Sequence, residues 1–96
     1  MTINIYKKQL YTMNPQWLKA GEVAQLLGTT RNKLFERMRK KKILRKNNQP
    51  HPQYINAQIF KLITYQKYNQ NGDLLMVTTT IRINSNQILV LSKLLK

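Results

Sequence analysis

The sequence predicts a single α+β domain of the small winged helix-turn-helix type, with a helix pair, a β-hairpin wing and a C-terminal helix. Three observations predict it. Two segments of helical periodicity meet at Gly28-Thr29-Thr30, two strand-like segments flank Asn71-Gly72, and an amphipathic segment lies at the C-terminus. With 96 residues, the chain has the size of one domain.

Residues 1–16 are predicted to be an N-terminal arm or short strand, and residues 17–96 the domain itself. Ile3 and Ile5 alternate within the arm, and Asn14-Pro15 ends it because this pair breaks regular structure. From Trp17 onward the pattern becomes helical.

The two helices of the pair are expected at residues 20–27 and 31–41. Gly28 supplies a left-handed stop after the first helix, and Thr29 or Thr30 can cap the second. Apolar residues recur at three- and four-residue spacing in both segments: Val23, Leu26, Leu27, Leu34, Phe35 and Met38. The start of the first helix is less well defined, because Lys19 stands at the cap position and leaves Glu22 without a capping-box partner.

The second half of the chain begins with a polar loop at residues 47–52, whose two prolines separate the helices from the strands. Residues 59–68 and 74–82 are rich in β-branched and aromatic types, and the Asn-Gly turn between them predicts a β-hairpin. Asn84 or Ser85 is expected to cap the last helix. The apolar side of that helix carries Ile88, Leu91 and Leu95, widened by Leu89, Val90 and Leu94.

Charge is the strongest global signal for function. Lys and Arg number 17 against 3 acidic residues, so the formal net charge is +14, and a polyanion is the expected partner. Nine of the basic residues fall between Arg31 and Lys46. This concentration favours a binding surface over a merely soluble basic protein.

The second helix of the pair is the predicted reading element for duplex DNA. Arg31, Asn32 and Lys33 lie in its first turn, where positive charge opposes the helix dipole and an approaching phosphate would relieve the conflict. These residues are the candidates for base edges, and the others should mostly contact phosphates or, in the hairpin, a wing tip near the backbone. The full set of DNA-binding candidates is Thr29, Thr30, Arg31, Asn32, Lys33, Arg37, Lys40, Lys41, Arg45, Lys46, Lys67, Asn69 and Asn71.

An ordered set of segments from Trp17 to the C-terminus resembles the KilA C-terminal (KilAC) domain of phage antirepressor proteins. The resembling segments are LKAGEVAQLLGTTRNKLFERMRKKKIL, HPQYINAQIF, NGD and LLK. The resemblance implies a winged-helix-like DNA-binding domain, usually carried behind another domain of a longer phage protein. We expect a stand-alone relative or a small regulator of a phage or integrated element. Asn84-Ser85-Asn86-Gln87 departs from the family's Thr-Pro-Lys-Gly-like start of the last helix.

Catalysis, metal binding and cofactor binding are not expected. The titratable candidates His51, Glu22, Glu36 and Asp73 are widely spread, and the absence of cysteine with a single histidine makes a transition-metal site improbable. No apolar run approaches the length of a membrane span, so we expect an intracellular protein that does not bind membranes. The resemblance to phage proteins implies the cytoplasm or nucleoid of a bacterial host.

The main alternative is a protein-interaction module that binds and inactivates a repressor without contacting DNA. The last helix is more apolar than one buried face requires, so it could bind a repressor or form a homodimer. A single-strand binder is a further alternative, because the charge and the five tyrosines would serve it equally well. Competition between duplex and single strands would separate these cases.

Overall fold

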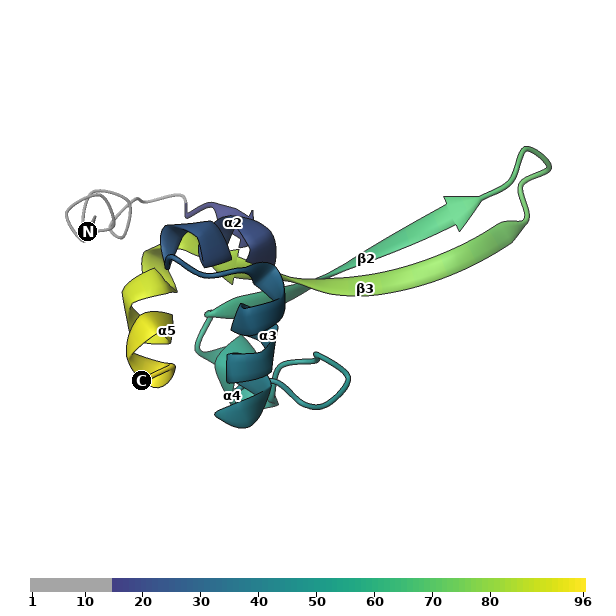
Figure 1. Ribbon diagram of the computed structural model, residues 1–96. Coiled ribbons are helices and arrows are strands. Elements are labelled where there is room, and N and C mark those ends of the chain that lie inside the picture. The colour runs from purple at the N-terminus through teal and green to yellow at the C-terminus, as the bar shows by residue number, and fades with distance from the viewer. Residues whose placement is uncertain (1–14) are drawn as a thin grey trace.

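The computed structural model describes residues 15–96 and shows the α+β domain that the sequence predicts. A three-stranded antiparallel sheet has the strand order β1-β3-β2, and the helices pack around its base while the β2–β3 hairpin extends away from them (Figure 1). The elements in chain order are β1 (Trp17–Lys19), α2 (Ala20–Leu26), α3 (Arg31–Lys40), α4 (Pro52–Asn56), β2 (Phe60–Tyr68), β3 (Leu74–Asn84), the 3-10 turn η1 (Ser85–Gln87) and α5 (Ile88–Leu94).

Helices α2 and α3 form the predicted helix pair. Gly28 turns the chain between them with φ of +74°, a left-handed conformation that residues with a Cβ avoid. Thr30 is the N-cap of α3, and its Oγ1 accepts a hydrogen bond from the backbone N–H of Lys33 at 3.3 Å. Glu22 accepts one from the backbone N–H of Lys19 at 3.0 Å. A single carboxylate therefore satisfies a free amide at the start of α2 although Lys19 is a poor cap residue.

The helix pair and the base of the sheet share one core. Val23 and Ala24 of α2 are buried, as are all three predicted apolar residues of α3, which are Leu34, Phe35 and Met38. They pack with apolar side chains from the rest of the chain: Ile43, Leu44, Ile59, Phe60, Ile81, Ile83, Leu91 and Leu95. Burial of each large side chain contributes about 1.5–3 kcal/mol to the free energy of folding. The apolar cluster therefore determines which side of α3 faces the core.

Helix α2 begins at Ala20, as predicted, but residues 17–19, where the helical pattern was taken to begin, form a strand that was not predicted. Strand β1 pairs with the end of β3, placing Trp17 opposite Asn84 and Lys19 opposite Arg82. Just before β1, Gln16 and Ser85 exchange two hydrogen bonds of 2.8 and 3.0 Å. A long-range partner therefore overrides the local helical pattern. The predicted arm falls largely on residues 1–14, which lie outside the described residues.

A short helix was not predicted where the proline-containing segment enters the hairpin. Pro50 makes an isolated bridge with Leu44, and α4 begins at Pro52, its first helical residue. Proline favours that position because its missing N–H has no helical partner there and its φ is already helical. Pro52 therefore initiates a helix, whereas the prediction treated it only as a breaker.

The hairpin is confirmed, with strands slightly displaced from the predicted bounds. The pairing runs from Phe60 opposite Ile83 out to Tyr68 opposite Leu74, with a register irregularity between Lys67 and Tyr68. The hairpin gives the molecule principal extents of 50 × 30 × 25 Å. Within residues 15–96, no helix is long and apolar enough to cross a membrane.

The last helix has the predicted buried side, but the predicted cap residue Asn84 caps the 3-10 turn before α5, and the N-cap of α5 itself is Gln87. Asn84 Oδ1 accepts a hydrogen bond from the backbone N–H of Asn86 at 2.9 Å, and one 3-10 turn precedes α5. Ile88, Leu91 and Leu95 are buried, whereas Val90 is 43% exposed. One side of α5 therefore fills the core, and Val90 faces solvent.

Candidate nucleic-acid interface

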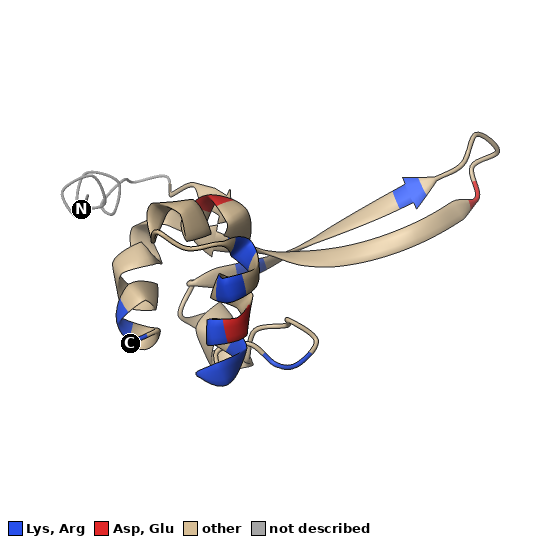
Figure 2. Cartoon of the chain, in the orientation of Figure 1, with Lys and Arg blue, Asp and Glu red and all other residues tan. Residues whose placement is uncertain are grey.

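The first turn of α3 presents three polar residues on the outer side of the domain. Arg31, Asn32 and Lys33 are exposed, while the next two residues, Leu34 and Phe35, are buried. The turn contains no acidic residue. Basic residues continue along α3 and into the following loop (Figure 2). The fold therefore orients the charge of α3 away from the core, which is the arrangement that entry of a helix into a groove requires.

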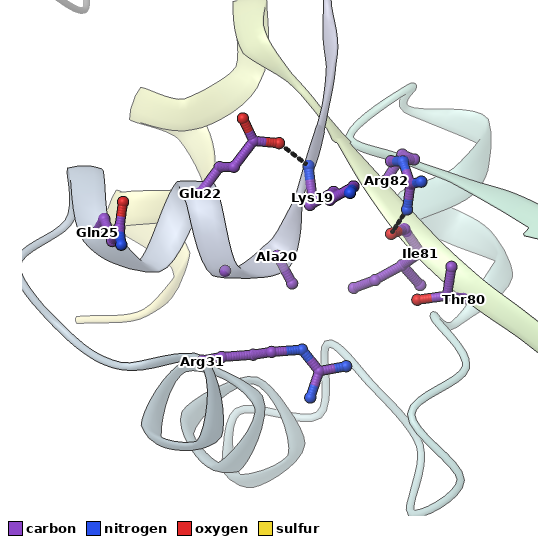
Figure 3. A pocket seen from close by; sticks show the side chains of 9 residues that line it. Lys19, Ala20, Glu22, Gln25, Arg31, Thr80, Ile81 and Arg82 are labelled. Carbon is purple, nitrogen blue, oxygen red and sulfur yellow. Dashed lines mark hydrogen bonds between the residues drawn. The ribbon is translucent and has the colours of Figure 1, made fainter.

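Arg31 also borders a cleft between α2, α3 and the base of β3. Its guanidinium carbon lies 4.5 Å from the centroid of the Phe35 ring, an interaction that offsets part of the dipole conflict at this end of the helix. The cleft has a volume of about 440 Å³, and Lys19 and Arg82 line it together with Arg31 and Glu22 (Figure 3). Three cations from separate elements meet at this cleft.

Two sequence candidates, Arg37 within α3 and Lys41 at its C-cap, each have a structural partner at the end of α5. Arg37 donates a hydrogen bond from Nη2 to the backbone oxygen of Leu95 at 2.5 Å, and Lys41 donates one from Nζ to that of Lys96 at 2.7 Å. Both side chains thus neutralise the carbonyl end of α5. Lys40 lies beside them, exposed, at a shallow cleft that the three residues line.

The loop after α3 forms a second basic surface. Arg45 and Lys46 are exposed and line a cleft of about 510 Å³ together with Arg39, Lys40, Lys42, Leu44 and His51. Arg39 donates a hydrogen bond from Nη1 to Asn48 Oδ1 at 2.6 Å, which ties the loop to the helix. The loop turns at two positions with positive φ, Lys42 and Asn48. The cations of this loop are therefore held near α3 by the hydrogen bond between Arg39 and Asn48.

The two threonine candidates precede α3 and differ in their surroundings. Thr30 is exposed and its hydroxyl is already engaged in capping the helix. Thr29 is half-buried and lines a small cleft with Leu27 and Arg37. The cap is thus a demonstrated role of Thr30, whereas the nucleic-acid contact predicted for either threonine stays a prediction.

The hairpin candidates are not brought together with α3. Lys67, Asn69 and Asn71 lie near the far end of the hairpin, which points away from the helices (Figure 1). Asn69 Oδ1 accepts hydrogen bonds from the backbone N–H groups of Asn71 and Asp73, each 2.9 Å. The Asn69 side chain therefore shapes the turn. The predicted wing-tip contact stays untested.

Four basic residues on this side of the domain are not among the candidates that the sequence predicted. Arg39 and Lys42 belong to the charge run and were left out, although the run itself pointed to them. Lys19 and Arg82 reach the cleft of Arg31 only because β1 pairs with β3. No local pattern indicates that pairing.

Comparison with known proteins gives one family match. The family model described as the phage antirepressor protein KilAC domain matches residues 10–96. No curated protein and no solved structure matches.

Proposed function

The chain belongs to the family of phage antirepressor protein KilAC domains, and from that premise we propose that it is a non-catalytic regulator of a phage or mobile element that binds duplex DNA. Helix α3 (Arg31–Lys40) enters the major groove, and the loop that carries Arg45 and Lys46 contacts the phosphates. The protein acts in the cytoplasm of a bacterial host.

The observation that carries this proposal is the first turn of α3. Recognition helices contact base edges with their N-terminal residues, and here Arg31, Asn32 and Lys33 are exposed at that end. Arginine and lysine can bind guanine, and asparagine adenine, through two hydrogen-bonding positions on the base edge. Because the turn has cations and no acidic residue, the positive end of the helix dipole meets no negative charge until an anion arrives. Phosphate is the anion that DNA would supply.

The affinity would come mainly from phosphate contacts. Each phosphate neutralised by a Lys or Arg contributes about −0.9 to the slope of log K against log salt for duplex DNA. Exposed cations of α3 and the following loop are available for such contacts: Lys33, Lys40, Lys42, Arg45 and Lys46. We therefore expect binding that falls steeply with salt and that prefers duplex over single strands.

The test is a fluorescence-anisotropy titration of labelled duplex DNA at several salt concentrations, comparing the wild-type chain with Lys33→Glu. Lys33 occupies the third position after the Thr30 cap, so a glutamate there completes a capping box and should stabilise α3. Weaker binding by this variant therefore cannot be attributed to unfolding. We expect the salt slope to decrease by about 1 or more.

Lys93→Glu is the matched control, because it makes the same charge change at an exposed position of α5. Its effect should be limited to the change in overall charge. Equal losses of affinity in the two variants would refute the assignment to α3. A wild-type chain that does not bind duplex at modest salt would refute DNA binding altogether.

The second candidate function is a protein-interaction module that inactivates a repressor without touching DNA. Val90 favours it, because this residue leaves an apolar side chain 43% exposed on the helix that the sequence singled out for partner binding. A failed DNA titration would make a repressor the partner to seek, and Val90→Lys would then be the variant expected to abolish the interaction.

A further inference from the structure

The hairpin has an outer part, residues 62–80, that we call the distal arm. It projects beyond the helices (Figure 1). Large apolar side chains line it without being buried. Four consecutive residues of β3 are each more than half exposed: Leu74 at 51%, Leu75 at 59%, Met76 at 55% and Val77 at 53%. A run of exposed apolar residues of this length is unusual unless it has a function.

Other large side chains add to this surface from β2. Tyr65 and Tyr68 are 50% and 53% exposed, and Leu62 is 40% exposed. Seven such side chains expose on the order of 600 Å² over both faces of the ribbon, given the 150–250 Å² that an aromatic side chain can bury. The alternation of strand residues places Leu62, Tyr68, Leu75 and Val77 on one face and Tyr65 and Met76 on the other. One face alone therefore offers less than the roughly 800 Å² per partner of a stable protein interface, so a stable contact here has to include the open strand edges as well.

The backbone of the distal arm is also unpartnered on its outer sides. Strand β1 covers β3 only from Arg82 to Asn84, so the β3 edge from Leu74 to Ile81 pairs with β2 alone. The opposite edge of β2 pairs with no strand among residues 15–96. A two-stranded ribbon is only marginally stable in water, and open edges favour pairing with another chain.

Charge indicates which partner fits. The distal arm contains one cation, Lys67, and one anion, Asp73, so it is formally neutral although the chain carries +14. Figure 2 shows the same contrast between the basic α3 region and the hairpin. Nucleic acid or an acidic protein would be drawn to the basic region. Two copies of this chain, by contrast, repel each other through their basic surfaces and can approach at a neutral segment such as the distal arm.

We propose that the distal arms of two copies associate and hold the protein as a homodimer. The interface buries one face of the distal arm, where the alternation of strand residues places Leu62, Tyr68, Leu75 and Val77. It is the same patch on both copies, as a two-fold contact requires. The arms keep the two bodies of like charge apart, and both α3 helices remain exposed. This dimer uses a different surface from α5, and it does not depend on whether the protein binds DNA.

The experiment is sedimentation velocity of the full chain without DNA, over a range of concentrations and at low and high salt. We expect a monomer–dimer equilibrium that shifts toward dimer as salt increases, because screening weakens the repulsion between the bodies. DNA binding would weaken under the same change, so failure of one proposal can be distinguished from failure of the other.

Substitutions assign the interface. Leu75→Thr with Val77→Thr removes apolar surface, adds no charge and retains β-branched residues suited to a strand, so we expect a dimer dissociation constant at least about tenfold higher. Val90→Lys places a charge on the exposed apolar residue of α5 and should change the constant only slightly. Circular dichroism verifies that both variants are folded.

Two results would overturn the proposal. One is a wild-type chain that stays monomeric at every concentration and salt tested. The other is a dimer that Val90→Lys dissociates while the double threonine variant does not, which would place the interface on α5.

Discussion

Arg37 and Leu95 are joined by a hydrogen bond of 2.5 Å between the guanidinium Nη2 and the backbone oxygen, although 58 positions separate them in the sequence. The contact ties the middle of α3 to the last turn of α5. It places a positive charge where carbonyl groups of a helix end lack partners, so it both satisfies an acceptor and complements the helix dipole.

We predict that Arg37→Ala lowers the free energy of unfolding by about 1–2 kcal/mol, because the carbonyl of Leu95 loses a charged donor. Urea denaturation measures the change. Lys40→Ala, at a neighbouring exposed position, should alter stability by less than about 0.5 kcal/mol. Equal stability of Arg37→Ala and wild type would mean that the contact contributes nothing in solution.

Asn32 should affect sequence preference more than overall affinity. Its side chain is exposed in the first turn of α3, carries no charge and can bind an adenine edge through two hydrogen bonds. Once a preferred site has been selected from random duplexes, Asn32→Ala should cost about 1–3 kcal/mol on that site and little on random DNA. The salt slope should not change. A uniform loss over all duplexes would contradict a base contact.

The turn between α2 and α3 requires glycine because of its backbone conformation and not because space for a side chain is lacking. Gly28 has φ of +74°, and a Cβ added there would meet nothing within 4 Å. Gly28→Ala should therefore destabilise the fold by about 1 kcal/mol through backbone strain. Gly21→Ala is the control, since Gly21 lies within α2 with equal space around it and alanine favours the helix by about 0.5–1 kcal/mol. Thermal melts should shift in opposite directions.

The elements that the sequence predicted are those that local patterns determine. Gly28 and the Thr30 cap delimit the helix pair, Asn71-Gly72 marks the hairpin turn, and Asn84 caps the turn before α5. Strand β1 escaped prediction because its partner lies at the other end of the domain. Helix α4 escaped because five residues are too few for a periodic pattern.

In the candidate site, too, features set by local patterns could be predicted and features set by long-range contacts could not. The outward orientation of Arg31, Asn32 and Lys33 follows from the apolar spacing of α3 and could be predicted. The hydrogen bonds of Arg37 to Leu95 and of Lys41 to Lys96 could not be predicted, because side-chain contacts between distant segments leave no local signal in the sequence. The exposure of Leu74–Val77 was equally hidden, since an apolar strand segment usually indicates burial.

The cleft beside Arg31 leads to the last prediction. Lys19 is exposed at this cleft, and the hydrogen bond to Glu22 uses its backbone N–H, which alanine would retain. Lys19→Ala should therefore leave stability nearly unchanged. If a DNA phosphate occupies the cleft, the variant should lower the salt slope by about 1 in the anisotropy titration.

Lys61→Ala is a useful comparison, because Lys61 is another exposed cation of the sheet, 4.9 Å from the Trp17 ring centroid, and it does not line the cleft. Its loss should leave the slope unchanged. A slope that Lys19→Ala does not alter would confine the phosphate contacts to α3 and its following loop. The approach of Lys19 and Arg82 to Arg31 would then be a consequence of the pairing of β1 with β3, with no role in binding a ligand.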